Sequence, residues 1–121
     1  MTRAGLVLVA GDPGRRPPSD PVTLAEFMTR SAKNDPARRH GLILWNHGAG
    51  SVVGFGADEG YGGQSLSVTG IRQALEIRRD LERAHERAGA TLELIGLNGS
   101  LMSTTEVAYA VSPFARCMVA S

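Results

Sequence analysis

The chain has 121 residues and a formal net charge of +1, a size that fits one domain with a core of two or three layers. Its arginines are scattered along the sequence, which argues against nucleic acid or an anionic membrane as the main partner. The single cysteine, Cys117, excludes an internal disulfide and a zinc site built from thiolates. We expect no metal and no cofactor.

The N-terminal residues 1–14 contain an apolar patch of six residues. This patch is shorter than the apolar core of a signal peptide, and no stretch approaches the roughly 20 apolar residues of a membrane-spanning helix. As written, the chain looks soluble, unexported and cytoplasmic, but the sequence leaves its localisation undetermined.

The first elements in chain order are a short strand at 5–10 and a Pro/Gly-rich loop at 11–20. Thr23 and Glu26 then form a capping-box pattern, which predicts a helix from Thr23 to about Ala32. Its expected apolar stripe is Leu24, Phe27 and Met28. The segment 34–36, Asn-Asp-Pro, ends this helix before the next strand.

Residues 42–45, Leu-Ile-Leu-Trp, form an unbroken apolar run, which suits a parallel strand covered on both faces. His47 follows the strand and is flanked by Gly48 and Gly50. A lone histidine at a strand end is more often structural than catalytic. The adjacent glycines favour catalysis here, because they let a substrate backbone approach a side chain suited to proton transfer.

Residues 51–65 contain five glycines and show no steady period, so we predict a long surface loop. The segment 48–53 lacks the third glycine of a dinucleotide fingerprint, and no phosphate-binding lysine follows it. The sequence therefore gives little support for nucleotide binding. The adjacent acids Asp58 and Glu59 are most simply solvated charges.

The longest helical pattern covers 67–88, with His85 on its surface and Gly89 as a stop. Its expected apolar stripe is Val68, Ile71, Leu75, Leu81, Ala84 and Ala88. A strand at 91–97, a helix opened by the capping box of 103–106 and a strand at 116–120 complete the chain. Strands and helices that alternate in this way predict an α/β fold, with a mainly parallel sheet and helices on both faces.

Consecutive strands of such a sheet are commonly neighbours, and ligands bind at the carboxyl ends of the strands. His47 and the turn of Asn98, Gly99 and Ser100 are therefore expected side by side at one edge. A base and a nucleophile require this arrangement.

Three segments resemble the clostripain family of cysteine peptidases, which have a caspase-like fold: 42–50 (LILWNHGAG), 65–75 (SLSVTGIRQAL) and 94–121. The resemblance begins near Pro21, so residues 1–20 match poorly, and it implies a single partial peptidase domain over 1–121. It assigns His47 as the catalytic histidine. The family's nucleophilic cysteine stands in an Asp-Ala-Cys-Leu-Met motif, and Ser100 occupies that position here.

The family's Asp-Ala-Cys is Asn98-Gly99-Ser100 in this sequence. A hydroxyl needs stronger activation than a thiol. In the family the acid lies in the pocket for a basic side chain, and a neutral Asn98 holds Arg or Lys less well. Cys117 lies within the last predicted strand and cannot readily replace the missing thiol.

Three hypotheses follow, and the first is a clostripain-like peptidase domain that is inactive or impaired. The second is a hydrolase in which Ser100 is the nucleophile, His47 is the base, and N–H groups near Gly48 and Ser100 form an oxyanion hole. The third is a non-catalytic interaction module that pairs through an exposed strand edge. The expected partner is a peptide or protein substrate, contacted also by Asn98, Gly48 and Gly99. The oligomeric state stays open.

Overall fold

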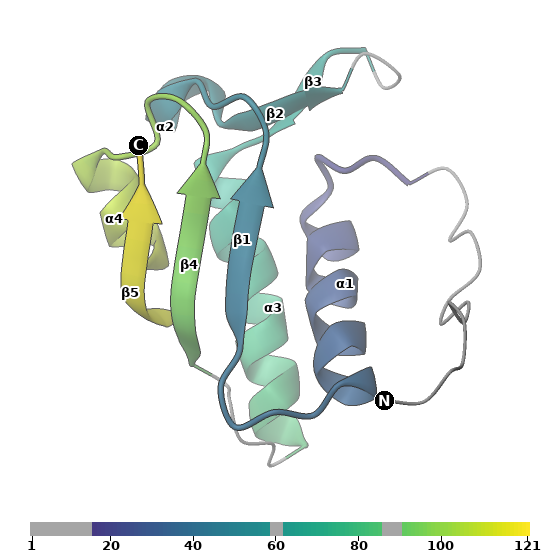
Figure 1. Ribbon diagram of the computed structural model, residues 1–121. Helices are drawn as coiled ribbons and strands as arrows, with labels where there is room; N and C mark the ends of the chain where they lie inside the picture. Colours follow the sequence, from purple (N-terminus) through teal and green to yellow (C-terminus); the bar gives the residue numbers. More distant parts are fainter. Residues whose placement is uncertain (1–15, 59–61, 86–90) are drawn as a thin grey trace, which may run out of the picture.

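The structure is a computed structural model, and it describes residues 16–58, 62–85 and 91–121. Figure 1 shows parallel strands in front of helices, with a small antiparallel strand pair beyond the carboxyl ends of the sheet. The elements in chain order are α1 (Pro21–Asn34), β1 (Gly41–Trp45), α2 (Gly50–Val53), β2 (Phe55–Asp58), β3 (Gln64–Leu66), α3 (Val68–Ala84), β4 (Leu92–Asn98), α4 (Thr105–Val111) and β5 (Ala115–Ala120). The predicted strand at 5–10 lies outside the described residues.

The main sheet has the order β1-β4-β5, and both strand pairs are parallel. In the register of β1 with β4, Leu42 pairs with Ile95 and Trp45 pairs with Asn98. The predicted fold class, an α/β domain with a mainly parallel sheet flanked by helices, is confirmed. Within the described ranges, no helix has the length and apolar character needed to cross a bilayer.

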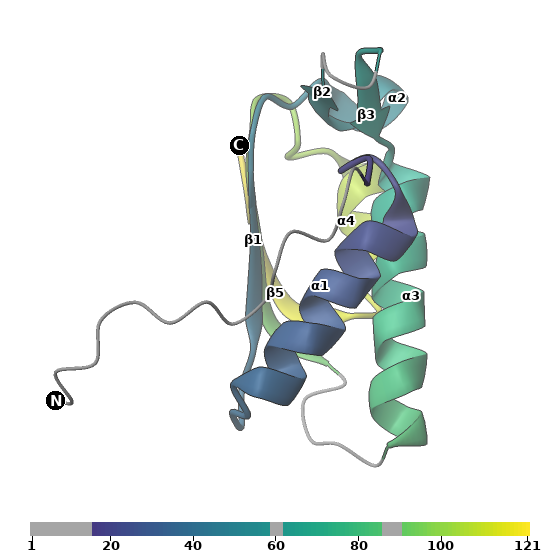
Figure 2. The same ribbon diagram turned by 90° about the vertical axis from the view of Figure 1, so that its right-hand side faces the viewer.

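The helices α1, α3 and α4 all lie on one side of the sheet (Figure 2), whereas the sequence predicted helices on both faces. Burial follows this arrangement, because Leu42 is 5% exposed while its neighbour Ile43 is 68% exposed. Trp45 is 83% exposed. The expectation of a strand covered on both faces is therefore wrong for the described part of the chain. An apolar run in the sequence does not show whether helices pack on one face of the strand or on both.

The cap of helix α1 lies three residues before the predicted cap. Asp20 is the cap, and its side chain accepts a hydrogen bond from the Val22 N–H at 2.9 Å. Pro21 follows at the first helical position, where its missing N–H costs no hydrogen bond. The predicted cap Thr23 lies inside the helix. Of the predicted stripe, Leu24 and Met28 are buried, but Phe27 is 61% exposed.

Helix α3 begins at its Ser67 cap, in agreement with the prediction, and the described part ends at Ala84 with exposed His85 as the C-cap. Ile71 and Leu75 are buried as predicted. Val68 is partly buried, Leu81 is 38% exposed and Ala84 is exposed, and Ala88 lies outside the described residues.

The buried face of α3 continues through Arg78 and Glu82 in place of Leu81. Positions 71, 75, 78 and 82 follow the helical period, and Leu81 lies one residue off it. Burial lowers the pKa of the Arg78 guanidinium, and the nearby Glu82 carboxylate opposes this shift. The predicted stripe is therefore wrong in including Leu81 and in omitting Arg78 and Glu82.

The predicted long loop at 51–65 contains three short elements: α2, β2 and β3. Gly54, Gly56, Gly62 and Gly63 all have positive φ values, a conformation that side chains with a Cβ rarely adopt. Phe55 and Leu66 pair across β2 and β3, and each is 6% exposed. Two buried anchors thus order a segment whose glycine content suggested irregular structure.

Helix α4 is capped by Thr104, whose side chain accepts a hydrogen bond from the Val107 N–H at 3.3 Å. The predicted capping box placed the cap one residue earlier, at Ser103. The helix leads through Phe114 into β5, and the Phe114 side chain is 2% exposed.

Candidate active site

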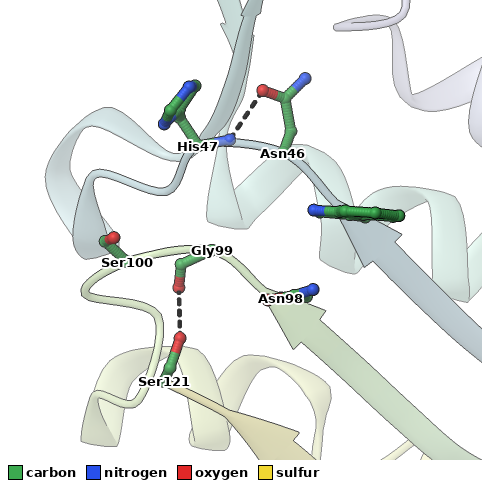
Figure 3. A pocket seen from close by; sticks show the side chains of 7 residues that line it. Asn46, His47, Asn98, Gly99, Ser100 and Ser121 are labelled. Carbon is green, nitrogen blue, oxygen red and sulfur yellow. Dashed lines mark hydrogen bonds between the residues drawn. The ribbon is translucent and has the colours of Figure 1, made fainter.

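A cavity of about 510 Å³ opens at the carboxyl ends of β1 and β4, and its residues are drawn in Figure 3. They come from three places far apart in the sequence: the end of β1 and the segment after it, the end of β4 and the turn after it, and the residue after β5. The lining residues are Trp45, Asn46, His47, Asn98, Gly99, Ser100 and Ser121. Since β1 and β4 are adjacent and parallel, their carboxyl ends meet at one edge.

The structure brings His47, Asn98, Gly99 and Ser100 together in this cavity. His47, Asn98 and Ser100 are exposed, while Gly99 is buried. Gly48 is half-buried beneath them and does not line the cavity. The sequence expectation that the histidine and the 98–100 turn meet at one sheet edge therefore agrees with the structure. Their chemical roles remain proposals.

The His47 loop and the 98–100 turn are packed backbone against backbone. A Cβ atom on Gly48 would lie 2.3 Å from the Ser100 carbonyl oxygen, far inside van der Waals contact. A Cβ atom on Gly99 would lie 2.7 Å from the Asn46 carbonyl oxygen and 2.9 Å from the Gly48 nitrogen. Only glycine allows this approach without a shift of one segment. Gly48 and Gly99 thus set the distance between the two loops.

Hydrogen bonds on both sides hold the main chain around His47. The Asn46 side-chain oxygen accepts from the His47 N–H at 2.7 Å, as Figure 3 shows. The Gly56 N–H donates to the His47 carbonyl at 2.7 Å, and Gly48 forms an isolated bridge with Phe55. Strand β2 therefore supports the histidine loop. The sequence analysis did not predict this role, although a single aromatic residue between two glycines, Phe55, indicated a buried side chain within the loop.

Ser121 holds the turn that carries Ser100. Its hydroxyl donates to the Gly99 carbonyl at 3.1 Å (Figure 3). Its main-chain oxygen accepts from the Met102 and Ser103 N–H groups at 2.7 and 3.0 Å. Within the turn, Leu101 has a φ of 62°, a value uncommon for a residue with a Cβ. Three hydrogen bonds from one residue thus fix a turn with a strained backbone.

The side chains that the described part of the chain offers to the cavity include one imidazole and two serine hydroxyls. Of the described residues that line it, none carries a carboxylate side chain. Among the hydrogen bonds between described residues, none joins the His47 ring to the Ser100 hydroxyl, and Figure 3 draws the two side chains on facing segments. A serine nucleophile ordinarily needs both that contact and a group that orients the histidine.

Cys117 lies in β5, pairs with Leu94 in the body of the sheet and is exposed. It is absent from the lining of the cavity. The expectation that it cannot take the place of the missing nucleophile agrees with this position. Across residues 16–58, 62–85 and 91–121, no group of three or more His, Cys, Asp or Glu side chains is placed to hold a metal ion.

The family model described as the clostripain family matches residues 17–121. No curated protein and no solved structure matches the chain. The match covers α1 and every later element, including both loops of the cavity.

Proposed function

The chain belongs to the clostripain family of cysteine peptidases, and from this premise we propose that it is a peptidase-like domain that binds peptides but turns them over poorly or not at all. The cavity shared by His47 and Ser100 carries this proposal. It has the imidazole that such a peptidase uses as a base, and a hydroxyl where the family has its thiol. The substrate class is a peptide or protein, as in the family.

Two features of the cavity support impaired turnover. The Ser100 hydroxyl has a much higher pKa than a thiol, so an imidazole alone produces little of the nucleophilic anion. The described lining also offers no carboxylate side chain to orient the His47 ring. Each tenfold loss in rate corresponds to about 1.4 kcal/mol of barrier, and these two deficits together amount to several such factors.

The test is hydrolysis of a fluorogenic arginyl peptide by the unmodified chain and by Ser100→Cys combined with Cys117→Ser, so that the only thiol of this variant is at the site. Cys117→Ser alone is the control. We expect background hydrolysis from the unmodified chain. Ser100→Cys should gain a thiol that iodoacetamide alkylates faster with His47 present than in the His47→Ala variant. Adding Asn98→Asp to Ser100→Cys should increase selectivity for basic peptides, because it restores a carboxylate beside the cavity.

The same assay tests the alternative hypothesis that Ser100 is the nucleophile. Under that alternative the unmodified chain hydrolyses the peptide, and both His47→Ala and Ser100→Ala abolish the activity. If the unmodified chain hydrolyses the peptide and both substitutions abolish this activity, the proposal of impaired turnover is refuted. If calorimetry shows that blocked peptides do not bind the unmodified chain at all, the peptide-binding part of the proposal is wrong.

A further inference from the structure

Trp45 lies where two cavities meet. This residue is 83% exposed, and it lines both the site cavity and a neighbouring groove of about 490 Å³. This second cavity, the apolar groove, lies between α1, β1 and the β2–β3 pair. Its apolar walls include Leu24, Phe27, Leu44, Phe55 and Leu66. Asn46 also lines both cavities, so residues 45 and 46 form the boundary between them.

Neither cavity offers a charged partner for a basic side chain. Among the described residues, no Asp, Glu, Lys or Arg lines the site cavity or the apolar groove. A guanidinium or ammonium group that enters must lose water without gaining an ion pair, which is unfavourable. A neutral side chain carries no such penalty. Charge alone therefore favours neutral peptides over basic ones.

The geometry around Trp45 favours an aromatic side chain among the neutral ones. Trp45 and Asn98 are direct partners in the parallel register of β1 and β4, and both line the site cavity. An indole face stacks on another aromatic ring, and a carboxamide donates to and accepts from a phenol hydroxyl. A tyrosine side chain combines the two groups that these residues recognise, an aromatic ring for Trp45 and a hydroxyl for Asn98.

We propose that this site selects peptides carrying a neutral aromatic residue, tyrosine above all, next to an apolar residue. In this arrangement Trp45 is the residue that determines specificity, and the apolar groove takes the adjacent side chain. The inference rests on the proposed function, since it names the substrate class of the same site.

The test compares blocked peptides that differ at one position, Tyr, Leu or Arg, each beside a constant leucine. Trp45 is the only tryptophan of the chain, so its fluorescence reports binding directly, and calorimetry gives the dissociation constants of every variant. We expect the Tyr peptide to bind roughly fivefold or more tightly than the Arg peptide. Trp45→Ala should remove this preference, and Trp45→Phe should retain part of it. Asn98→Asp should shift the preference toward the Arg peptide.

Tyr109→Ala is the matched control. Tyr109 is an aromatic residue on α4 that is 76% exposed and lines neither cavity, so its loss should leave the preference unchanged. Tighter binding of the Arg peptide to the unmodified chain overturns the inference. So does equal binding of all three peptides, although the proposed peptide site then survives. If none of the peptides binds, the proposed function fails as well.

Discussion

At the scale of single residues, the site requires two glycines as well as its polar side chains. Gly48 and Gly99 let the His47 loop and the Ser100 turn touch through their backbones. In the family motif that the sequence resembles, the residue at position 99 is alanine. In this structure that methyl group would meet the Asn46 carbonyl and the Phe55 ring, each at 2.7 Å. In this chain, position 99 therefore has room for glycine but not for alanine unless a neighbour shifts.

The residue-scale prediction concerns Gly99→Ala. The added methyl group must displace backbone or a buried ring, so we expect it to lower the free energy of unfolding by about 1–3 kcal/mol. Chemical denaturation measures the change. Gly41→Ala is the control, because its Cβ would find Leu94 atoms no nearer than 3.6 Å, an ordinary contact. Equal stability of the two variants would show that the loops separate easily.

At the scale of elements, helix α3 connects the core to the segment that leads into β5. The Arg72 and Arg79 guanidinium groups lie 5.9 and 5.0 Å from the centroid of the buried Phe114 ring. Such contacts between a cation and an aromatic face are favourable, and more so when partly desolvated. Together with buried Arg78 and Glu82, they give α3 a buried face that is partly charged. Because this buried face includes charged side chains, a prediction from apolar residues alone wrongly placed Leu81 on it.

The element-scale prediction compares two leucines of α3. Leu75 is 1% exposed and Leu81 is 38% exposed. We expect Leu75→Ala to cost about 2–5 kcal/mol, because it leaves a cavity in the core. Leu81→Ala should cost less than about 1 kcal/mol, since the site is partly solvated and alanine favours a helix. Urea denaturation of both variants decides the matter, and a reversed order would mean that α3 is rotated about its axis.

At the scale of the whole molecule, the described part of the chain is a two-layer structure with one open sheet face. Figure 2 shows helices on one side of the sheet. Ile43 and Val119 are 68% and 60% exposed on the other side. The site cavity lies at the edge of this layer pair, where the carboxyl ends of β1, β4 and β5 converge.

The whole-molecule prediction uses adjacent residues of β1 that point to opposite faces. Leu42→Ala should destabilise the fold by about 2–5 kcal/mol, because Leu42 packs in the core beneath the helices. Ile43→Ala should cost less than about 1 kcal/mol, since only strand preference is lost on an open face. Thermal unfolding of the two variants measures the difference. Equal losses would mean that both faces of the sheet are covered in solution.

The sequence by itself determined the α/β fold class and placed the strands β1, β4 and β5 to within one residue at each end. It also brought His47 and the 98–100 turn to the same edge. Apolar runs bounded by turns are local features, so they marked these three strands, whereas the glycine-rich β2–β3 pair was missed. Adjacency followed because consecutive parallel strands are usually neighbours and share their carboxyl edge.

Tertiary structure alone decided which faces are buried and what supports the site. The exposure of Ile43, the burial of Arg78 and the order of the β2–β3 pair all depend on partners distant in the sequence. The role of Ser121 is the clearest case, since it bonds a turn that lies 18 to 22 residues earlier. Periodicity describes the faces of a single element, but burial is a property of the space between elements, which folding alone creates.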